Sequence, residues 1–377
     1  MEISKFIKNL KQLDSGEFFT GVPDSLLSTL NDYIIQQHGV TGNHIIAANE
    51  GNAVGIAAGY YMSTGKIPVV YLQNSGIGNI VNPVASLLNE NVYGIPCIFV
   101  IGWRGEPGVH DEPQHVFQGK ITLDILDVLG IIYFVIDKNT SEDEINDFIK
   151  KNKVTLNSGR NLAFVVKKNG LSSNEKSSYQ NENSLIRENV IKEITAVSQD
   201  DIVISTTGKS SRELFEVREF KNQSHKFDFL TVGSMGHSSS IAFEIAVNKP
   251  KSKIWCIDGD GAAIMHLGSM AIIGSNKPKN LIHVLINNAS HESVGGFPTA
   301  AKTIDFLKIA EGCGYTKIFS VDTYESLVNA LSIVKNINEL CFVEIKTTIG
   351  SRSNLGRPTK TAKENKEIFM DLLNSRK

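Results

Sequence analysis

Two polar motifs in the second half of the chain follow apolar, strand-like runs. Asp260 stands in a Gly-Asp-Gly triplet just after the run Lys253–Ile257, and Asn288 follows the run Leu281–Ile286. The Asp260 carboxylate and the Asn288 amide oxygen are hard oxygen ligands, and a backbone carbonyl at Ser290 would add a third. If the two runs are neighbouring strands, this set leaves positions open for water and phosphate oxygens, as Mg²⁺ prefers. The spacing therefore predicts a magnesium site at Asp260, Asn288 and Ser290.

The glycines around Asp260 suit the approach of a diphosphate. Gly259 and Gly261 let the backbone come close to phosphate oxygens, and a helix that begins here would direct its N-terminal dipole at the anion. The alternative is a tight Gly-Asp-Gly turn and a pair of asparagines that simply end a strand. The occurrence of both motifs, each after an apolar strand and 25 residues apart, favours a ligand site.

A buried acid is predicted in the first half of the chain. Glu50 opens a helical pattern of mostly small residues, Gly51–Ser63, directly after the segment HIIAAN. A carboxylate flanked by Ala, Gly and Ile loses contact with water, which is the setting of many catalytic acids and bases. The alternative is a glutamate that only stabilises the N-terminal end of a helix dipole.

These motifs need elements that bring them to one edge of a sheet, and short apolar runs alternate with helical patterns along the whole chain. The predicted strands are Glu17–Thr20, Val69–Leu72, Cys97–Ile101, Ile131–Val135, Leu162–Val166, Asp201–Ser205, Lys253–Ile257, Leu281–Ile286 and Cys341–Lys346. The predicted helices include Gly51–Ser63 and Val81–Asn91. This alternation predicts an α/β protein with two doubly wound domains and mainly parallel sheets. Ligands of such sheets bind beyond the carboxyl ends of the strands, where the motifs lie.

The boundary between the two domains is predicted from composition. The stretch Lys167–Asn189 is rich in Ser, Asn, Lys and Glu, and we expect it to be an exposed linker. The resulting division is a first domain over residues 1–168, a linker over 169–183 and a second domain over 184–377. No middle domain separates the two.

Composition also excludes several classes of protein. A net charge of −2 with 41% hydrophobic residues argues against a nucleic-acid-binding or membrane-surface protein. No run is long enough to span a membrane and no signal peptide is recognisable, so we expect a cytoplasmic location. Cys97, Cys256 and Cys341 lie in strand-like runs without C-x-x-C spacing, which predicts reduced core side chains rather than metal ligands or disulfides.

The paired Gly-Asp-Gly and Asn-Asn motifs resemble the thiamine-diphosphate signature shared by pyruvate decarboxylase, acetolactate synthase and transketolase. The resemblance implies the thiamine-diphosphate-binding fold, with thiamine diphosphate and Mg²⁺ as cofactors. It implies that Asp260, Asn288 and the Ser290 carbonyl hold the metal, and that the first domain binds the pyrimidine while the second binds the diphosphate. One departure is Ala289, where relatives often have Gly; a ligand that coordinates through its backbone tolerates this change.

Further segments resemble the same superfamily. Glu50 matches the glutamate that hydrogen-bonds the aminopyrimidine ring, and Met235 matches the bulky apolar residue under the bent cofactor. The resemblance implies the following cofactor-binding residues: Glu50, Gly208, Lys209, Ser210, Gly233, Ser234, Met235, Gly259, Asp260, Gly261, Ala262, Asn288 and Ser290. The alternatives are that Met235 only packs in the core and that the turn around Gly208 is an ordinary helix N-cap.

The absence of a middle domain narrows the resemblance. Pyruvate decarboxylase and acetolactate synthase carry a third domain between the two cofactor-binding ones, whereas here the polar linker joins them directly. This plan is similar to that of the phosphonopyruvate decarboxylases, carbon–carbon lyases that convert 3-phosphonopyruvate to phosphonoacetaldehyde and CO₂ in the biosynthesis of phosphonates such as 2-aminoethylphosphonate. The local segments that fit this family are Gly21–Leu27, Trp103–His115, Thr207–Leu214 and Gly350–Thr359.

Three other functions stay open. A sulfopyruvate decarboxylase would have the same plan and take a sulfonate in place of the phosphonate. A carboligase such as acetolactate synthase fits less well, because the middle domain is missing. A non-catalytic protein that binds a nucleotide or diphosphate would have no need of an activating carboxylate at Glu50.

Catalysis also requires proton transfer and recognition of a doubly charged phosphonate. Asp24 and His115 match positions that carry acid/base residues in pyruvate decarboxylase, and histidine exchanges protons readily near neutral pH. A helix N-cap and a plain loop histidine are the respective alternatives. Arginine binds such oxygens well. The predicted substrate-binding residues are Asp24, Arg104, His110, His115, His291, Arg352 and Arg357, with Lys209, Arg212 and Glu292 as further candidates.

The resemblance has one consequence for assembly. In the superfamily, the glutamate of one subunit completes the site whose diphosphate-binding domain belongs to its neighbour. A homodimer or larger oligomer is therefore expected, with a small 2-oxo acid as substrate, and an isolated monomer should be inactive.

Overall fold

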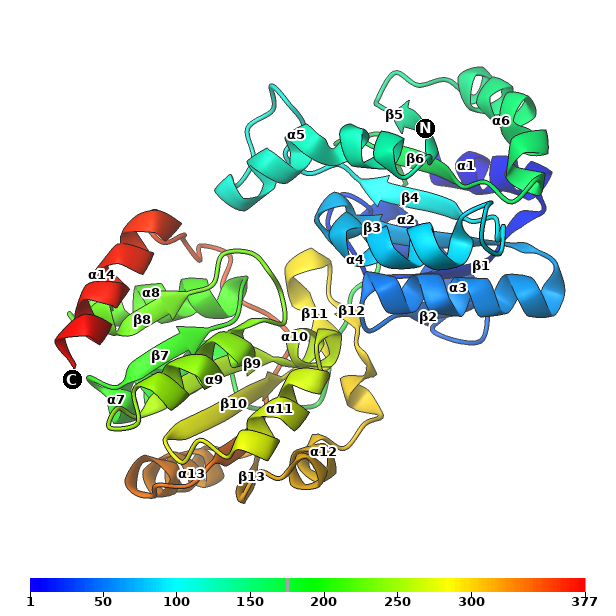
Figure 1. Cartoon of the computed structure of the whole chain (residues 1–377). Coiled ribbons are helices and arrows are strands. Elements are labelled where there is room, and N and C mark those ends of the chain that lie inside the picture. Colours follow the sequence, from blue (N-terminus) through cyan, green and yellow to red (C-terminus); the bar gives the residue numbers. More distant parts are fainter. Residues whose placement is uncertain (174–175, 377) are drawn as a thin grey trace. The chain divides into compact units, whose positions relative to one another are not determined.

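The computed structural model describes residues 1–173 and 176–376, which form two compact units, Met1–Ser178 and Tyr179–Lys377 (Figure 1). Each unit contains a six-stranded parallel sheet with helices on both faces. The prediction of two doubly wound α/β domains without a middle domain is confirmed. The boundary between the two units, between Ser178 and Tyr179, lies within the predicted linker.

The first unit has the strand order β2-β1-β3-β4-β6-β5. Its strands are β1 (Ser15–Gly21), β2 (His44–Ile46), β3 (Ile67–Gln73), β4 (Ile98–Gly102), β5 (Ile132–Ile136) and β6 (Leu162–Val166). Its helices are α1 (Ile3–Leu10), α2 (Ser28–His38), α3 (Glu50–Thr64), α4 (Ile77–Pro83), α5 (Pro113–Val128) and α6 (Glu142–Asn157). Because successive strand residues point to opposite faces, α1, α2 and α6 pack on one face and α3, α4 and α5 on the other.

The second unit has the strand order β13-β14-β10-β9-β7-β8, with a separate two-stranded hairpin. The sheet contains β7 (Ile202–Ser205), β8 (Asp228–Leu230), β9 (Ile254–Gly259), β10 (Leu281–Asn287), β13 (Lys317–Val321) and β14 (Cys341–Lys346), and the hairpin pairs β11 (Ser290–His291) with β12 (Phe297–Pro298). The helices are α7 (Arg187–Ser198), α8 (Lys209–Phe220), α9 (Ser238–Asn248), α10 (Asp260–Met265), α11 (Gly268–Asn276), α12 (Phe306–Cys313), α13 (Tyr324–Asn336) and α14 (Ala362–Ser375).

Both sheets reverse their direction of winding at a defined place. In the first unit the chain passes from β1 to β2 on one side and then to β3 on the other; in the second unit β7, β8 and β9 repeat this pattern. Loops at such a reversal diverge and leave room for a ligand beyond the strand ends. Of the predicted site residues, Asp24 follows β1, Gly208 follows β7 and Asp260 follows β9 at these reversals, while the others follow neighbouring strands.

The predicted strands agree with the structure to within one or two residues at each end. The short strands β2, β8 and β13 were not predicted. The helix expected over Val81–Asn91 is wrong in its bounds, because α4 begins at Ile77 and ends at Pro83, followed by a π-helical turn over Val84–Leu88. Proline has no N–H to donate, which favours such an irregularity.

The predicted linker is only partly an exposed connector. At its start, the Met1 ammonium donates to the Gly170 carbonyl at 2.9 Å, and Leu171 is buried. Near its end, the Asn181 side chain donates to the carbonyls of Asn288 and Thr347, both at 3.0 Å. This part of the linker therefore supports the loop that carries the predicted metal ligand.

All four cysteines are free, as predicted. Among the described residues, no helix is both long enough and apolar enough to cross a membrane.

Candidate active site

The predicted metal ligands lie at two adjacent strand ends. Strands β9 and β10 pair in parallel, with Gly259 opposite Ile286, so the residues that follow them emerge side by side. Asp260 begins α10, and Asn288 comes directly after β10. The sequence prediction that these two residues meet at one edge of the sheet is consistent with this register.

The chemistry of these residues fits a cation with oxygen ligands. Asp260 is 4% exposed, and its carboxylate accepts a hydrogen bond from the Thr299 hydroxyl at 2.6 Å. Burial raises the pKa of Asp260 to about 6, although Thr299 and backbone N–H groups act to lower it. In the part of the chain that the structure describes, no ion pair joins Asp260 to a basic side chain. A metal ion bound here would stabilise the ionised form of this buried carboxylate.

The backbone of Ser290 connects Asp260 with Asn288. Its N–H donates to Asn288 Oδ1 at 3.0 Å and also lies close enough to Asp260 to favour the ionised carboxylate. The two side-chain oxygens therefore approach the same backbone group. Ala289, the departure from the glycine common in relatives, adopts a left-handed φ of 55°, a conformation that costs a non-glycine residue about 1 kcal/mol.

Two predicted residues, Met235 and His291, converge on the backbone of Gly261. A Cβ atom built there would lie 2.9 Å from the His291 ring and 3.2 Å from the Met235 methyl group, so only glycine fits without displacing them. Burial lowers the pKa of His291 to about 4, which keeps the ring neutral at physiological pH. Met235 follows Ser234, whose φ of 51° is left-handed. The Gly-Asp-Gly loop, Met235 and His291 thus form one surface.

The turn before α8 lies beside this surface. Gly208 has a φ of 93°, and Lys209 and Ser210 form the first turn of the helix. The Thr207 hydroxyl donates to the Val232 carbonyl at 2.6 Å, which ties this turn to the segment containing Gly233 and Met235. The Lys209 ammonium contacts Glu292 at 2.9 Å.

In the first unit, Glu50 is the first residue of α3, after the N-cap Asn49. Its side chain is 5% exposed, and Oε2 accepts a hydrogen bond from the Asn79 amide at 2.6 Å. A Cβ atom at Gly76 would lie 2.3 Å from Glu50 Oε1. Glu50 is therefore enclosed by the turn that follows β3. Asn79 escaped prediction because its partner lies 29 residues away, and only the polar segment QNSGIGN after a strand hinted at it.

Asp24 follows β1 and is fully buried. Burial raises its pKa to about 6, against the opposing effects of the Arg104 charge and of backbone N–H groups. Oδ2 accepts from the Leu26 N–H at 3.0 Å, while Oδ1 has no hydrogen-bond partner among the described residues. A Cβ atom at Gly102 would lie 2.1 Å from Oδ2, so the carboxyl group of Asp24 can occupy this position only because residue 102 is a glycine.

Comparison with known proteins places both units in one family. Residues 5–128 match the model of the thiamine pyrophosphate enzyme N-terminal TPP binding domain, and residues 206–345 match that of the C-terminal TPP binding domain. Phosphonopyruvate decarboxylase from Streptomyces viridochromogenes is 31% identical over 368 residues, covering 91% of this chain and 88% of the relative. The chain belongs to the phosphonopyruvate decarboxylase family.

Other members and relatives align over most of the chain. Phosphonopyruvate decarboxylase from Streptomyces hygroscopicus is 28% identical over 90% of this chain and 86% of its own length. Sulfopyruvate decarboxylase from Methanosarcina acetivorans is 28% identical over 78% of this chain and 79% of its own length. These relatives are carbon–carbon lyases that release CO₂ from a 2-oxo acid, so the family is one of carboxy-lyases.

In this member of the phosphonopyruvate decarboxylase family, several cations predicted to face the substrate are already engaged. Arg104 donates from Nε to Asp111 at 2.8 Å and from Nη1 to Ser25 at 3.0 Å. Arg352 pairs with Glu188 at 3.0 Å and also with Glu216. Neighbouring carboxylates thus pair with both guanidinium groups, and the role of these residues toward a phosphonate stays a prediction.

The remaining candidates occupy varied settings. Arg212 donates to the backbone carbonyl of Gly356 at 2.6 Å and so holds the C-terminal loop. His110 and Arg357 are exposed. His115 is not a loop residue, since it lies in the first turn of α5. Glu292 does not face open space, because it binds Arg187, Lys209 and Asn288.

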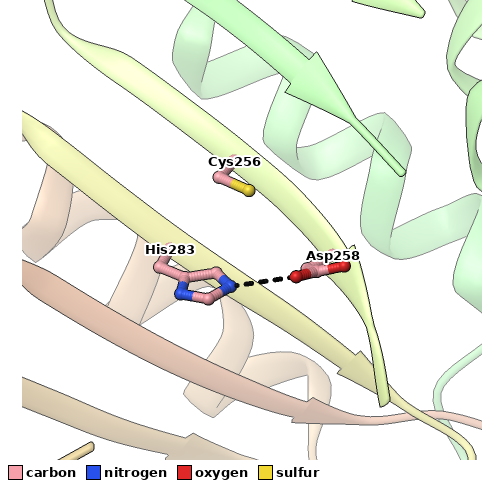
Figure 2. Close-up of side chains that lie close together, drawn as sticks. All are labelled: Cys256, Asp258 and His283. Atoms are coloured by element: carbon pink, nitrogen blue, oxygen red, sulfur yellow. Dashed lines mark hydrogen bonds and ion pairs between the residues drawn. The ribbon is translucent and has the colours of Figure 1, made fainter. Parts of the chain in front are cut away.

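A buried cluster of Cys256, Asp258 and His283 lies on the adjacent strands β9 and β10, which lead into the loops of Asp260 and Asn288 (Figure 2). Its sulfur, carboxylate and ring nitrogen lie within 4.8 Å of one another. The His283 ring is already satisfied: Nε2 lies 3.4 Å from Asp258 and Nδ1 lies 3.0 Å from the Tyr315 hydroxyl. Burial raises the pKa of the Cys256 thiol, as expected for an inert core side chain.

The carboxylate of this cluster also supports the loop above it. Asp258 Oδ1 accepts the Gly259 N–H at 2.9 Å and the Ser238 hydroxyl at 3.3 Å. Since Ser238 begins α9, the cluster connects the Gly-Asp-Gly loop with the helix that follows Met235. We interpret it as a hydrogen-bonded support rather than a second metal site.

Proposed function

We propose that this chain catalyses the thiamine-diphosphate- and Mg²⁺-dependent decarboxylation of 3-phosphonopyruvate to phosphonoacetaldehyde and CO₂, a step in phosphonate biosynthesis toward 2-aminoethylphosphonate. The observation that carries the proposal is the similarity to two phosphonopyruvate decarboxylases along about nine tenths of the chain. The placement of Asp260 and Asn288 at adjacent strand ends supports it.

The chain's own residues have distinct roles in this proposal. Asp260, Asn288 and the Ser290 carbonyl would hold Mg²⁺ against the diphosphate, and Met235 would support the bent cofactor. When bound, thiamine diphosphate supplies a nucleophilic carbon and an electron sink for the electrons released with CO₂. Glu50, held by Asn79, would hydrogen-bond the pyrimidine ring and keep a proton at that ring in place.

Asp24 is the proposed acid/base group, with His115 as its partner. A carboxyl with a pKa near 6 is present in both protonation states close to neutral pH, so it can donate a proton and accept one. Its burial also excludes water from the carboxylate that must be expelled from the substrate. The phosphonate would be bound by residues among Arg104, His110, His291, Arg352 and Arg357, and those already paired would act together with their carboxylates.

We further propose that two copies of the chain are required. Helix α3 exposes a stripe of small and apolar residues: a Cβ atom at Gly55 or Gly59 would meet nothing within 4 Å, and Met62 is 67% exposed. Such a stripe suits close packing against a second subunit. Sedimentation should show a dimer or larger oligomer, and a fully active monomer would contradict this.

A sulfonate substrate is the second candidate, because a sulfopyruvate decarboxylase aligns over 78% of the chain. The experiment is CO₂ release from phosphonopyruvate, sulfopyruvate and pyruvate, each with and without thiamine diphosphate and Mg²⁺. Fastest cofactor-dependent turnover of phosphonopyruvate would support the proposal. Activity on sulfopyruvate alone would agree with the proposed mechanism but show that the substrate is a sulfonate. Inactivity on all three substrates would favour the alternative of a non-catalytic diphosphate-binding protein.

A further inference from the structure

A cluster of four charged side chains, three of them buried, lies directly behind the proposed metal ligand Asn288. Arg187 donates to Glu213 at 2.7 and 2.8 Å and to Glu292 at 2.6 Å, while Lys209 contacts Glu292 at 2.9 Å. The side chains of Arg187, Glu213 and Glu292 are at most 7% exposed. Buried ionised groups of this kind are retained only where each has several partners.

Glu292 has one contact that the rest of the cluster lacks. Its Oε2 accepts a hydrogen bond from the Asn288 amide nitrogen at 2.9 Å, while Asn288 Oδ1 accepts the Ser290 N–H at 3.0 Å. An inverted amide would place its oxygen against a carboxylate and its nitrogen against an N–H donor. Both contacts would then be repulsive, so the orientation of the Asn288 amide is fixed from both ends.

We propose that Glu292, anchored by Arg187, is a positioning residue that holds Asn288 with its oxygen presented to the cation. This inference rests on the proposed function, because the cation is part of it. Glu292 is itself an unsuitable ligand, since Arg187, Lys209 and Asn288 already occupy its two oxygens. Outer partners that orient metal ligands in this way typically contribute a factor of about 10 to 100 to metal affinity.

The anchor comes from outside the part of the chain that matches the family model. Arg187 is the first residue of α7, and the matched C-terminal domain begins at residue 206. Glu213 lies on α8 and Glu292 in the turn after β11. The Arg187 guanidinium thus links α7, α8 and the turn after β11. This link holds Glu292 in place, and Glu292 in turn accepts the hydrogen bond from the Asn288 amide.

The cluster provides a matched control for the test. Glu292→Met and Glu213→Met each remove one carboxylate from Arg187, but only the first removes the acceptor for Asn288. The Mg²⁺ dissociation constant is measured by titration calorimetry on the full-length protein with saturating thiamine diphosphate, and thermal unfolding of both variants is recorded. We expect Glu292→Met to raise the dissociation constant about 10- to 100-fold and Glu213→Met to leave it within about twofold. Both should lose thermal stability, because each leaves the buried Arg187 with one carboxylate fewer.

A conservative variant distinguishes orientation from general damage to the fold. Glu292→Gln retains an oxygen that can accept from Asn288, so its Mg²⁺ affinity should lie within a few fold of the wild type. Wild-type affinity in Glu292→Met, or equal weakening in Glu213→Met, would overturn the proposal. A wild-type protein that binds no Mg²⁺ with the cofactor would instead refute the proposed metal site on which the inference depends.

Discussion

The side-chain amide of Asn79 lies 2.6 Å from Oε2 of Glu50, and the two residues come from different helices, α4 and α3. A hydrogen bond to a charged group contributes roughly 1.5–3 kcal/mol, more than a neutral one. In a site where a carboxylate must point at one ring nitrogen, this bond sets the direction of the side chain.

Asn79→Ala should therefore lower kcat roughly 10- to 100-fold while the protein stays folded. Asn82→Ala is a suitable control, because Asn82 lies on the same helix and, among the described residues, its side chain hydrogen-bonds only to Ser86. Steady-state CO₂ release measures both. Equal kcat values for the two variants would show that Asn79 does not position Glu50.

Glu50→Gln should abolish turnover, with a loss of at least about 100-fold, because an amide cannot replace the carboxylate in proton exchange with the pyrimidine. Thiamine diphosphate binding, followed by fluorescence quenching, should change little. Undiminished CO₂ release from this variant would remove Glu50 from the mechanism.

Gly76→Ala should inactivate the enzyme, because the new methyl group would lie 2.3 Å from Glu50 Oε1 and force that side chain to move. Gly42→Ala makes the same chemical change where nothing lies within 4 Å. Activity of both variants, alongside circular dichroism, separates displacement of Glu50 from loss of folding. A fully active Gly76→Ala enzyme would show that Glu50 has another acceptable position.

Asp24→Asn should stabilise the protein in a pH-dependent way. The folded pKa of Asp24, about 6, is higher than the ordinary value of 3.8, so ionisation opposes folding and stability falls as pH rises through 6. The variant escapes this cost, and its free energy of unfolding should exceed that of the wild type by up to about 3 kcal/mol at pH 8. Urea denaturation between pH 4 and 8 tests this: the gain should vanish near pH 4. A difference independent of pH would contradict it.

Removal of the metal should release the cofactor. Asp260 is the only charged side chain among the proposed ligands, so Asp260→Asn should weaken Mg²⁺-dependent binding of thiamine diphosphate by at least about 100-fold. Chelation of the wild-type protein should have the same effect, reversed by added Mg²⁺. If neither the Asp260→Asn substitution nor chelation weakens cofactor binding, the proposed magnesium site is wrong.

Much of this architecture could be predicted because its signals are local. Buried parallel strands appear as continuous apolar runs, and the residues that end them, such as Asp260 and Asn288, are marked by glycine and asparagine. Two of the strands that escaped prediction, β2 and β8, have three residues each, which is too short for a hydrophobic pattern to stand out. The third, β13, has five residues, and only its last residue is buried.

The partners of the charged residues could not be predicted. Arg104 and Arg352 are predicted to bind a phosphonate, and the sequence did not show that each is paired with a carboxylate. Arg352 and Glu188 are 164 residues apart, and Arg187 and Glu292 are 105 apart. A sequence shows the sign and number of charges, but only the fold decides which of them meet. The hydrogen bond of Asn79 to Glu50 and the ion pairs of Arg187 could not be predicted for the same reason.

The hydrogen bonds from Asn181 to the carbonyls of Asn288 and Thr347 limit where the reading frame can be divided into two genes. Asn181 lies near the end of the polar stretch that was predicted to be only a linker, yet its side chain supports the backbone of a proposed metal ligand. Division after Ser178 leaves Asn181 on the second polypeptide, together with the loop it supports. Division at residue 184 would instead place Asn181 on the first polypeptide, apart from the loop that it supports. We therefore expect a two-gene version of this protein to be more active when the second polypeptide begins ahead of Asn181 than when it begins after it.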